Sequence, residues 1–203
     1  DEQYCTDNIH PSVAAAIKQG LDILKARGAI ILPAAMPDSR EAVELWGVIC
    51  GAEAAVAHAS TYPERKEDYS QNYREFLDQG LSSNGIDYAR AAIARREFTG
   101  AFAKLFEQID VFVAPIMPTP VPSTTDFLAQ CEEPDGLTRL INYTSPQDLS
   151  GNPAIILPGG LDATGAPLGF QLVGRHQQEE VLFRAGMAYQ EDADWPTSPP
   201  LLV

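Results

Sequence analysis

Three short apolar segments, each closed by a proline, constrain the fold of this chain more than any other feature of its sequence. They are Ala29–Pro33, Asp110–Pro115 and Ala154–Pro158. A continuous apolar run of this length is typical of a strand that is buried on both faces of a sheet, and proline ends the regular pairing of a strand. The sequence therefore predicts a sheet that other elements cover on both sides.

Helical patterns lie between and around the predicted strands. Apolar residues recur every three or four positions, with charged residues on the opposite side, as in amphipathic helices. These patterns predict helices over residues 11–27, 38–60, 73–79, 86–108 and 177–191, the second of them starting from a capping box of Asp38 and Glu41. Turn residues at 162–165 predict a hairpin between Ala154–Pro158 and Leu168–Val173. The whole pattern predicts an α/β fold with a mixed β-sheet covered by helices.

Two stretches lack a clear period. Residues 61–72 are polar and are predicted to form a loop or an irregular helix. Residues 123–150 follow a proline-rich segment and are predicted to be mostly loop, with a short helix at 137–142. A loop of the second length inside a compact domain is usually functional. The helix at 86–108 is the most periodic, and its expected buried face consists of Ile93, Phe98, Phe102, Leu105 and Phe106.

The charge balance excludes whole classes of function. With 14 basic against 28 acidic side chains, the net charge is −14, and the four lysines form no cluster. Nucleic acids and anionic membrane surfaces bind to clustered lysine and arginine, so neither is an expected partner. Three widely spaced cysteines, Cys5, Cys50 and Cys131, give neither a disulfide framework nor a metal site, which indicates a reducing, cytoplasmic environment. No apolar run is long enough to span a membrane.

The length of 203 residues suits one domain, with an irregular proline-rich tail at 192–203. The first residue is Asp1 rather than Met, so we expect the sequence to be part of a longer protein. This expectation bears on function, because some parts of an active site would then lie outside these residues.

Three segments in the second half resemble the amidase signature family. Residues 110–120 resemble its strand-and-proline segment, residues 144–159 its threonine-to-glycine loop, and residues 167–174 its C-terminal hairpin. The segments occur in the family's order, and residues 11–59 and 87–96 fit the corresponding regions as well. The resemblance covers nearly the whole chain and implies the C-terminal part of the amidase signature fold.

The resemblance implies hydrolysis of a carbon–nitrogen amide bond by a serine, which a second serine held by a cis peptide and a lysine activate. A hydroxyl attacks only after a positioned base takes its proton, and the developing oxyanion needs hydrogen-bond donors. The Gly/Ser-rich segment that carries these groups has no match here, since Ser82–Gly85 lacks its glycine pairs and is better explained as a helix cap. No catalytic residue, metal or cofactor is therefore assigned to this chain.

Candidate substrate-binding residues lie in the two loops next to the predicted strands, because ligands of open α/β sheets bind beyond the strand ends. One loop follows the strand at 110–115, and the other precedes the strand at 154–158. The candidates are Ile116, Met117 and Thr119 in the first loop and Ile141, Tyr143, Thr144 and Asp148 in the second. The alternative for each is ordinary loop packing, because the argument comes from the fold alone.

Ile141 supports a narrower hypothesis about the substrate. In family members that act on glutamine attached to transfer RNA, an aspartate that recognises the amino group aligns with this position. Isoleucine accepts no hydrogen bond, so an apolar, aryl or alkyl amide is the expected substrate. Asp148 stands where the family usually has asparagine, and it keeps an acceptor while losing a donor.

Two hypotheses for the function remain open. In the first, the chain is the C-terminal portion of an amidase for a small-molecule amide and joins a missing N-terminal catalytic half of the same protein. In the second, it is a non-catalytic truncated homologue that binds a partner or a small amide. Both predict an inactive isolated chain. The open edge of a truncated sheet further predicts association with the missing half or with itself, as a homo-oligomer.

Overall fold

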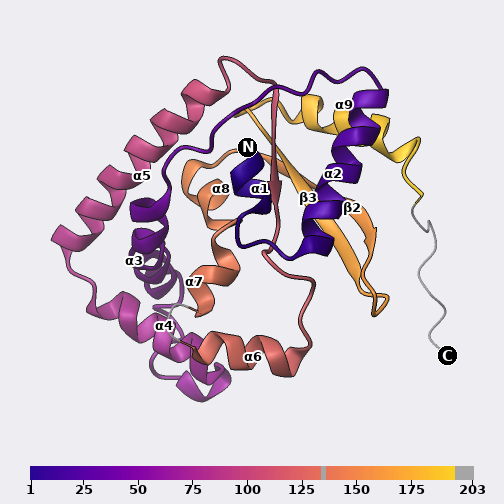
Figure 1. Ribbon diagram of the computed structural model, residues 1–203. Helices are drawn as coiled ribbons and strands as arrows, with labels where there is room; N and C mark the ends of the chain where they lie inside the picture. The colour runs from indigo at the N-terminus through magenta and orange to yellow at the C-terminus, as the bar shows by residue number, and fades with distance from the viewer. Residues whose placement is uncertain (134–135, 195–203) are drawn as a thin grey trace.

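A computed structural model describes residues 1–133 and 136–194 (Figure 1). Its helices are α1 (Glu2–Thr6), α2 (Pro11–Ala26), α3 (Arg40–Ala57), the 3-10 turn η1 (Lys66–Asp68), α4 (Gln71–Ser82), α5 (Gly85–Leu105), α6 (Thr124–Glu132), α7 (Gly136–Ile141), α8 (Ser145–Ser150) and α9 (Glu179–Gln190). Strands β1 (Val111–Pro115), β2 (Ala154–Leu161) and β3 (Pro167–Gly174) form an antiparallel sheet in the order β1-β3-β2. The predicted α/β class is confirmed, and the part of the sheet that the structure describes is antiparallel.

The hairpin predicted from the turn residues is confirmed. β2 and β3 pair in a register that places Leu157 opposite Phe170. The Asp162 side chain holds the turn by accepting hydrogen bonds from the backbone N–H groups of Thr164 and Ala166, at 2.8 and 2.9 Å. β2 runs past the proline that was expected to end it, because an irregularity between Pro158 and Leu161 absorbs the break in pairing.

One face of the sheet packs against α2 and α9 (Figure 1). The first core, which lies there, includes the buried residues Val13, Ala16, Ile17, Leu24, Leu157, Leu168, Phe170, Leu172, Leu182 and Tyr189. The Phe170 ring lies against Gly20 of α2, where a Cβ atom would come within 2.4 Å of the ring. The glycine therefore allows the helix to approach the sheet at this point.

The opposite face packs against α3, α5 and α8. The second core includes Ile49, Phe98, Phe102, Phe106, Phe112, Ala114, Leu149 and Val173. Phe98 and Phe102 of α5, and Phe106 directly after it, belong to the face that the sequence predicts to be buried. The prediction for Ile93 is wrong, since 47% of its surface is exposed. The Ile93 side chain lines a shallow groove together with Glu41 and Glu44 of α3.

The first apolar segment does not form the predicted strand. Residues 29–33 are extended but pair with no strand among the described residues, and the side chains of Ile30, Ile31 and Leu32 are 83%, 45% and 51% exposed. A strand needs a neighbour for its backbone groups, and residues 1–133 and 136–194 place none beside this one. The apolar pattern predicts burial, whereas these side chains are exposed in the described part of the chain.

Residues 123–150 are mostly helical, so the expectation of a loop is wrong. The short helix predicted at 137–142 is confirmed as α7, but α6 and α8 also form in this stretch. Helices of six to nine residues make fewer than three turns and show no clear apolar period. Capping residues define the ends of these helices instead. The Ser123 hydroxyl accepts from Asp126 N–H at 3.1 Å at the start of α6, and α8 ends at Gly151 with a φ of 74°.

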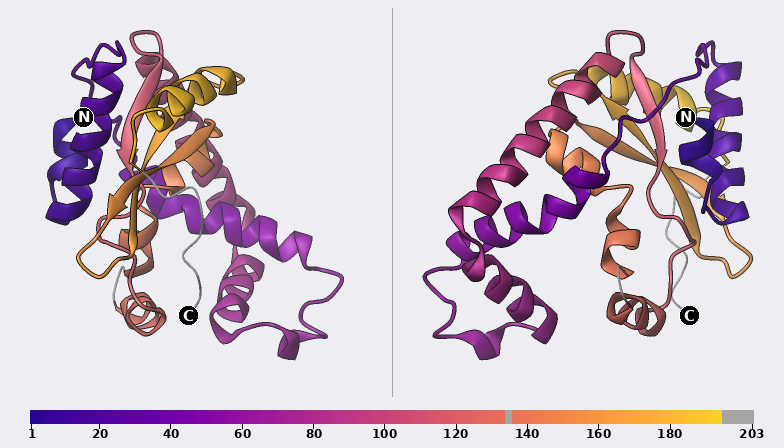
Figure 2. Two further views of the ribbon diagram at one scale, coloured as in Figure 1. Left: turned by 90° about the vertical axis from the view of Figure 1, so that its right-hand side faces the viewer. Right: turned by 60° about the vertical axis from the view of Figure 1, so that its left-hand side comes forward.

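The C-terminal end of α3, residues 58–70 and α4 form an arm that extends away from the sheet (Figure 2). α4 is longer than predicted and continues through Gly80. A Cβ atom there would lie 2.0 Å from the carbonyl oxygen of Gly51, so these two glycines let α3 and α4 come into backbone contact. The predicted capping box is wrong, because Ser39 precedes α3 and Asp38 instead accepts a hydrogen bond from the backbone N–H of Arg40 at 3.1 Å.

The chain ends agree in part with the sequence predictions. α1 is not predicted, whereas the last helix is confirmed as α9, with Leu182 and Tyr189 buried. Most of the proline-rich tail, from residue 195 on, lies outside the described residues. No helix in the described part of the chain has both the length and the apolar character that crossing a bilayer requires.

Candidate functional site

A buried glutamine ties together the two loops that were predicted to bind substrate. Gln171 lies in the middle of β3 and is 4% exposed. Its side-chain amide donates to the carbonyl oxygens of Pro115, at the end of β1, and of Tyr143, before α8, each at 2.6 Å. A charge-free amide with two buried partners fixes both loops relative to the sheet. The loops that carry the candidate residues therefore start from one common point.

Aromatic packing completes this junction. The Tyr143 ring lies 5.0 Å from the ring of Tyr4 in α1, and Tyr4 donates from its hydroxyl to the Asn142 carbonyl oxygen at 3.4 Å. Burial raises the pKa of both phenols above the ordinary tyrosine value. The phenols therefore stay neutral at physiological pH and act as hydrogen-bond groups rather than as charges.

An open pocket of about 610 Å³ lies beside this junction. The segment after β1, the loop that follows α1 and the α6–α7 region surround it. Its lining consists of Asn8, Pro118, Thr119, Gln130, Glu133, Gly136, Thr138, Arg139, Leu140, Asn142 and Tyr143. Glu133 and Arg139 form an ion pair with each other at this wall. The other lining residues that the structure describes are uncharged.

The structure brings two of the candidate residues into this pocket. Thr119 and Tyr143 line it, although they come from different predicted loops. The described lining does not include the other candidates. Ile116 instead reaches over β3, where a Cβ atom on Gly169 would lie 3.0 Å from its Cδ1, and Met117 is half-buried. The substrate-binding role of all these residues remains a prediction.

Ile141 and Thr144 lie at the junction between α7 and α8. Ile141 is half-buried, and its carbonyl oxygen accepts hydrogen bonds from the hydroxyls of Thr144, at 3.3 Å, and Ser145, at 2.9 Å. Asp148 is exposed in α8. These residues shape the turn beside the pocket, and its geometry leaves the substrate hypothesis for Ile141 untested.

Long-range hydrogen bonds anchor α8 next to the site. Arg95 of α5 donates to the Leu149 carbonyl oxygen at 2.6 Å, and His176 Nε2 lies 2.8 Å from the Ser150 carbonyl oxygen. Asn152 is buried and donates to the Gly174 carbonyl oxygen at 2.7 Å. These contacts join α8 to both α5 and the end of β3, so the turn before α8 has a fixed position.

Sequence reasoning missed Gln171 and most of the α6–α7 lining. The signal for Gln171 is a single amide inside the apolar run Leu168–Val173, at a position where a strand side chain must be buried. A buried polar side chain requires partners, and here they are backbone carbonyls of remote segments. The α6–α7 residues carry no comparable signal, because their helices have no clear period.

No activated nucleophile emerges from the described residues. All four lysines are exposed, and Lys18 pairs with Asp22 at 2.8 Å. The interpretation of 82–85 as a helix cap is confirmed, since the Asn84 side chain accepts from Ile86 N–H at 2.9 Å at the start of α5. A general base has to lie within hydrogen-bond reach of the group whose proton it takes.

Cysteine and histidine also lack the geometry for catalysis. Cys5 is buried beside the Val113 carbonyl oxygen, at 3.7 Å, and burial raises the pKa of its thiol. His10 is exposed, and its Nδ1 lies 2.8 Å from the Ser12 hydroxyl. In the part of the chain that the structure describes, no three or more His, Cys, Asp or Glu residues gather as a metal site would require.

Curated relatives include several proteins named as amidases. The chain is 37% identical over 139 residues, 68% of its length, to a Mycobacterium tuberculosis protein named amidase AmiD, covering 29% of that protein. It is 28% identical over its whole length to an amidase of Pseudomonas putida, of which it covers 44%. It is also 30% identical, over 98% of its length, to a component of the glutamyl-tRNA(Gln) amidotransferase of Roseiflexus, of which it covers 45%. The chain thus spans less than half the length of these relatives.

Solved structures share the fold over nearly the whole chain. A crystal structure of an amidase superposes with a TM-score of 0.76, at 23% identity, over 93% of this chain and 43% of that one. The structure of 6-aminohexanoate cyclic dimer hydrolase superposes with a TM-score of 0.78, at 21% identity, over 95% of this chain and 44% of that one. The family model described as Amidase matches residues 2–183. The chain belongs to the amidase family, whose fold it shares.

Proposed function

We propose that this chain forms part of the sheet and one wall of the substrate pocket of an amidase that hydrolyses the carbon–nitrogen bond of a small amide. Family membership supports this activity class. The structural observation that carries the proposal is the largely uncharged pocket beyond the end of β1, which the Gln171 amide holds in place. Ligands of open sheets bind at such strand ends.

The catalytic groups are proposed to lie outside these 203 residues. The family mechanism inferred from the resemblance needs a serine, a second serine held by a cis peptide, and a lysine that takes up a proton. The exposed lysines do not fit that task, and the chain covers only 44% of the Pseudomonas putida amidase. We therefore propose that the chain works together with an N-terminal catalytic half of the same protein.

The substrate is proposed to be an apolar, aryl or alkyl amide. Pro118, Leu140 and Tyr143 give the pocket an apolar and aromatic side, and Thr119 and Asn142 supply neutral hydrogen-bond groups. The two charged residues of the described lining, Glu133 and Arg139, pair with each other, and the other described lining residues are uncharged. Ile141 lies beside this wall, and its apolar side chain also favours an apolar substrate.

A chimaera tests the proposal. The chain is joined to the part of the Pseudomonas putida amidase that lies outside the aligned region, and hydrolysis of a nitroanilide amide is followed by absorbance. We expect the folded chimaera to be active and the isolated chain to be inactive. Tyr143→Leu should raise KM about tenfold, since it removes an aromatic wall, with Val56→Leu on the exposed face of α3 as the control.

Two results would contradict the proposal. Hydrolysis by the isolated chain would require a nucleophile within these residues. A folded chimaera that binds the amide without cleaving it would favour the second hypothesis, a non-catalytic binding domain. Separate measurement of binding and of turnover distinguishes the two results.

A further inference from the structure

A shallow groove of about 450 Å³ lies between α3 and α5. Its described lining combines apolar and charged side chains from both helices. None of these residues lines the pocket beside Gln171, so the groove is a separate feature of the surface. Figure 1 shows α3 and α5 together at one side of the molecule, away from β2.

The centre of the groove is apolar. The lining positions on each helix are three or four residues apart, and positions so spaced share one helix face. They are 41, 44 and 45 on α3 and 90, 93, 94 and 97 on α5. Leu45 is half-buried and Ala94 is 7% exposed, whereas Ile93 is 47% exposed. The Ile93 side chain therefore offers apolar surface to a molecule that enters the groove.

Charged side chains flank this apolar centre. Glu41 and Glu44 lie on the α3 side and Glu97 on the α5 side, and all three are exposed. No lysine or arginine in residues 1–133 and 136–194 forms an ion pair with any of these glutamates. Arg90 is the one basic residue of the described lining, and its ion-pair partner is Asp87, at 4.0 Å. The groove therefore presents three unpaired carboxylates around an apolar centre.

These properties favour a basic amphipathic helix over other occupants. A groove between two helices can receive the apolar face of a third helix, and charges of opposite sign at its rim select the partner. A small cation would contact few atoms in so shallow a groove, whereas small-molecule sites enclose most of their ligand. A second copy is a poorer occupant, because two chains of charge −14 repel each other.

We propose that the groove between α3 and α5 binds an amphipathic helix of a partner protein, with lysine or arginine on both sides of its apolar stripe. Leu45 and Ile93 contact the stripe, and the three carboxylates face the basic residues. Arg90 lies about one helical turn from Ile93, so an acidic residue at that end of the partner helix fixes its direction. The inference does not rest on the proposed amidase function, because the groove and the proposed substrate pocket share no described lining residue.

Synthetic peptides test the proposal by fluorescence anisotropy with the 203-residue chain. The probe is a helix of about 18 residues, or five turns, with a leucine stripe between two rows of lysine. One control peptide has glutamate in place of lysine, and a second has the composition of the probe with its leucines distributed around the helix. The probe should bind at least about tenfold more tightly than either control peptide, and added salt should weaken its binding.

A pair of isoleucine variants locates the apolar contact. Ile93→Gln should weaken binding of the probe about tenfold, mainly through faster dissociation, because it removes the central apolar contact. The matched control is Ile86→Gln, which lies on the same helix outside the groove, at a residue that is 68% exposed. The control should leave the affinity unchanged.

A pair of double variants locates the charged contacts. Glu44→Gln combined with Glu97→Gln should weaken binding about fivefold, mainly through slower association, and should reduce its dependence on salt. Glu64→Gln combined with Glu107→Gln removes the same charge at exposed positions outside the groove. This control should change the affinity less than about twofold, because salt screens distant charges.

Four results would overturn the proposal. Equal affinity for the probe and either control peptide would mean that the chain has no preference for a basic amphipathic helix. An equal loss of affinity in Ile86→Gln and Ile93→Gln would place the peptide on another surface. Spermidine that displaces the probe at a similar concentration would identify a site for small cations. Binding by the isolated chain but not by the folded chimaera would show that the rest of the amidase covers the groove. A chimaera that binds the probe but hydrolyses no amide would contradict only the proposed function.

Discussion

The body of the molecule and its arm are held together by different chemistry. In the body, the sheet lies between two apolar cores, and Phe102, Phe170 and Leu172 are fully buried. In the arm, hydrogen bonds between polar groups of aromatic side chains add to a small apolar contact that includes the buried Leu77 and Tyr62. The body thus depends mainly on non-directional burial, and the arm depends in addition on the placement of individual atoms.

The donor and the acceptor of each hydrogen bond between side chains of the arm can be assigned. The Thr61 hydroxyl donates to the His58 carbonyl oxygen at 3.2 Å, so it accepts from the Tyr69 hydroxyl at 2.5 Å. Tyr69 then accepts from Nδ1–H of His58 at 2.9 Å, which leaves Nε2 to accept from Tyr73 at 3.1 Å. This chain of donors and acceptors assigns the Nδ1–H tautomer to His58. Four side chains thereby add directed contacts between the end of α3 and α4 to the apolar packing around Leu77.

Because of this difference, substitutions should destabilise the body and the arm in different ways. Loss of volume in the body leaves a cavity that close-packed neighbours fill only in part. The arm has fewer buried apolar groups and should open locally while the body remains folded. Substitutions in the body should therefore cost the most stability, and substitutions on the surface the least.

Phe170→Ala should have the largest effect on the body. The ring is fully buried against Gly20 and Tyr189, so its removal should cost about 3–5 kcal/mol of unfolding free energy. Denaturant unfolding followed by circular dichroism measures the change. The matched control is Phe183→Ala on α9, where the side chain is 61% exposed and the cost should be small. Similar costs for both variants would remove the distinction between core and surface.

Gln171→Leu tests whether the body also depends on directed polar contacts. The variant keeps the volume but leaves the carbonyl oxygens of Pro115 and Tyr143 without their donor, and it should cost about 2–3 kcal/mol. Gln190→Leu, at an exposed position of α9, is the control and should be nearly neutral. A neutral Gln171→Leu in denaturant unfolding would mean that water satisfies both carbonyls.

Much of the fold follows from the sequence because apolar patterns report burial. Helix α2, most of α5, α9 and the β2–β3 hairpin have patterns that match their contacts within the chain. The 29–33 segment shows the limit of this reasoning, since its apolar pattern predicts burial whereas Ile30, Ile31 and Leu32 are exposed. An apolar pattern predicts burial, but it does not identify the element against which a residue packs.

A smaller part of the candidate site than of the fold could be predicted from the sequence. Thr119 and Tyr143 were predicted from the rule that ligands bind beyond strand ends, and they do meet at one pocket. The Gln171 contacts join positions that are 56 and 28 residues away in the sequence, which no local pattern encodes. The α6–α7 wall depends on short helices that local caps determine.

Gly80→Ala should act on the arm alone. The new Cβ atom would lie 2.0 Å from the Gly51 carbonyl oxygen, so α3 and α4 must separate, at a cost of about 1–3 kcal/mol. Hydrogen exchange should become faster in α4 and the end of α3 and stay unchanged in β3. Gly100→Ala is the control, and it should raise stability rather than lower it. Nothing lies within 4 Å of the new Cβ atom, and the higher helix propensity of alanine should stabilise α5 by about 0.5–1 kcal/mol. Faster exchange throughout the sheet would contradict an independent arm.

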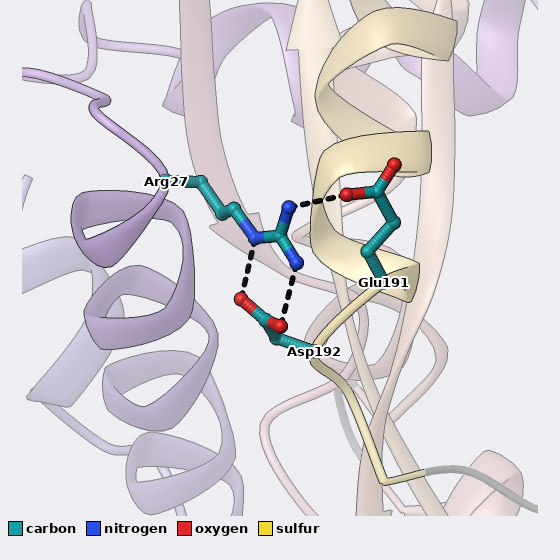
Figure 3. Close-up of polar contacts among 3 residues, drawn as sticks. All are labelled: Arg27, Glu191 and Asp192. Atoms are coloured by element: carbon teal, nitrogen blue, oxygen red, sulfur yellow. Dashed lines mark hydrogen bonds and ion pairs between the residues drawn. The ribbon is translucent and has the colours of Figure 1, made fainter.

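Arg27→Gln should have the smallest effect, one that salt and pH both modulate. The hydrogen bonds from Arg27 hold the pKa of Asp192 below its usual range (Figure 3). A carboxylate whose pKa is lowered by folding stabilises the folded state above its unfolded pKa of about 3.9, and the stabilisation is lost as the pH falls through the lower, folded pKa. The difference in melting temperature between the wild type and Arg27→Gln should therefore be present at pH 7 and disappear toward the acid end of the titration.

Salt and a second variant separate this contact from an ordinary surface pair. Lys18→Gln removes an exposed ion pair between residues four apart on α2, with side chains 78% and 64% exposed, and should change the melting temperature less than Arg27→Gln does. Both differences should shrink as salt screens the charges. A difference for Arg27→Gln that grows at low pH would mean that the charge of Asp192 opposes folding. The tie between α2 and α9 would then have to come from packing alone.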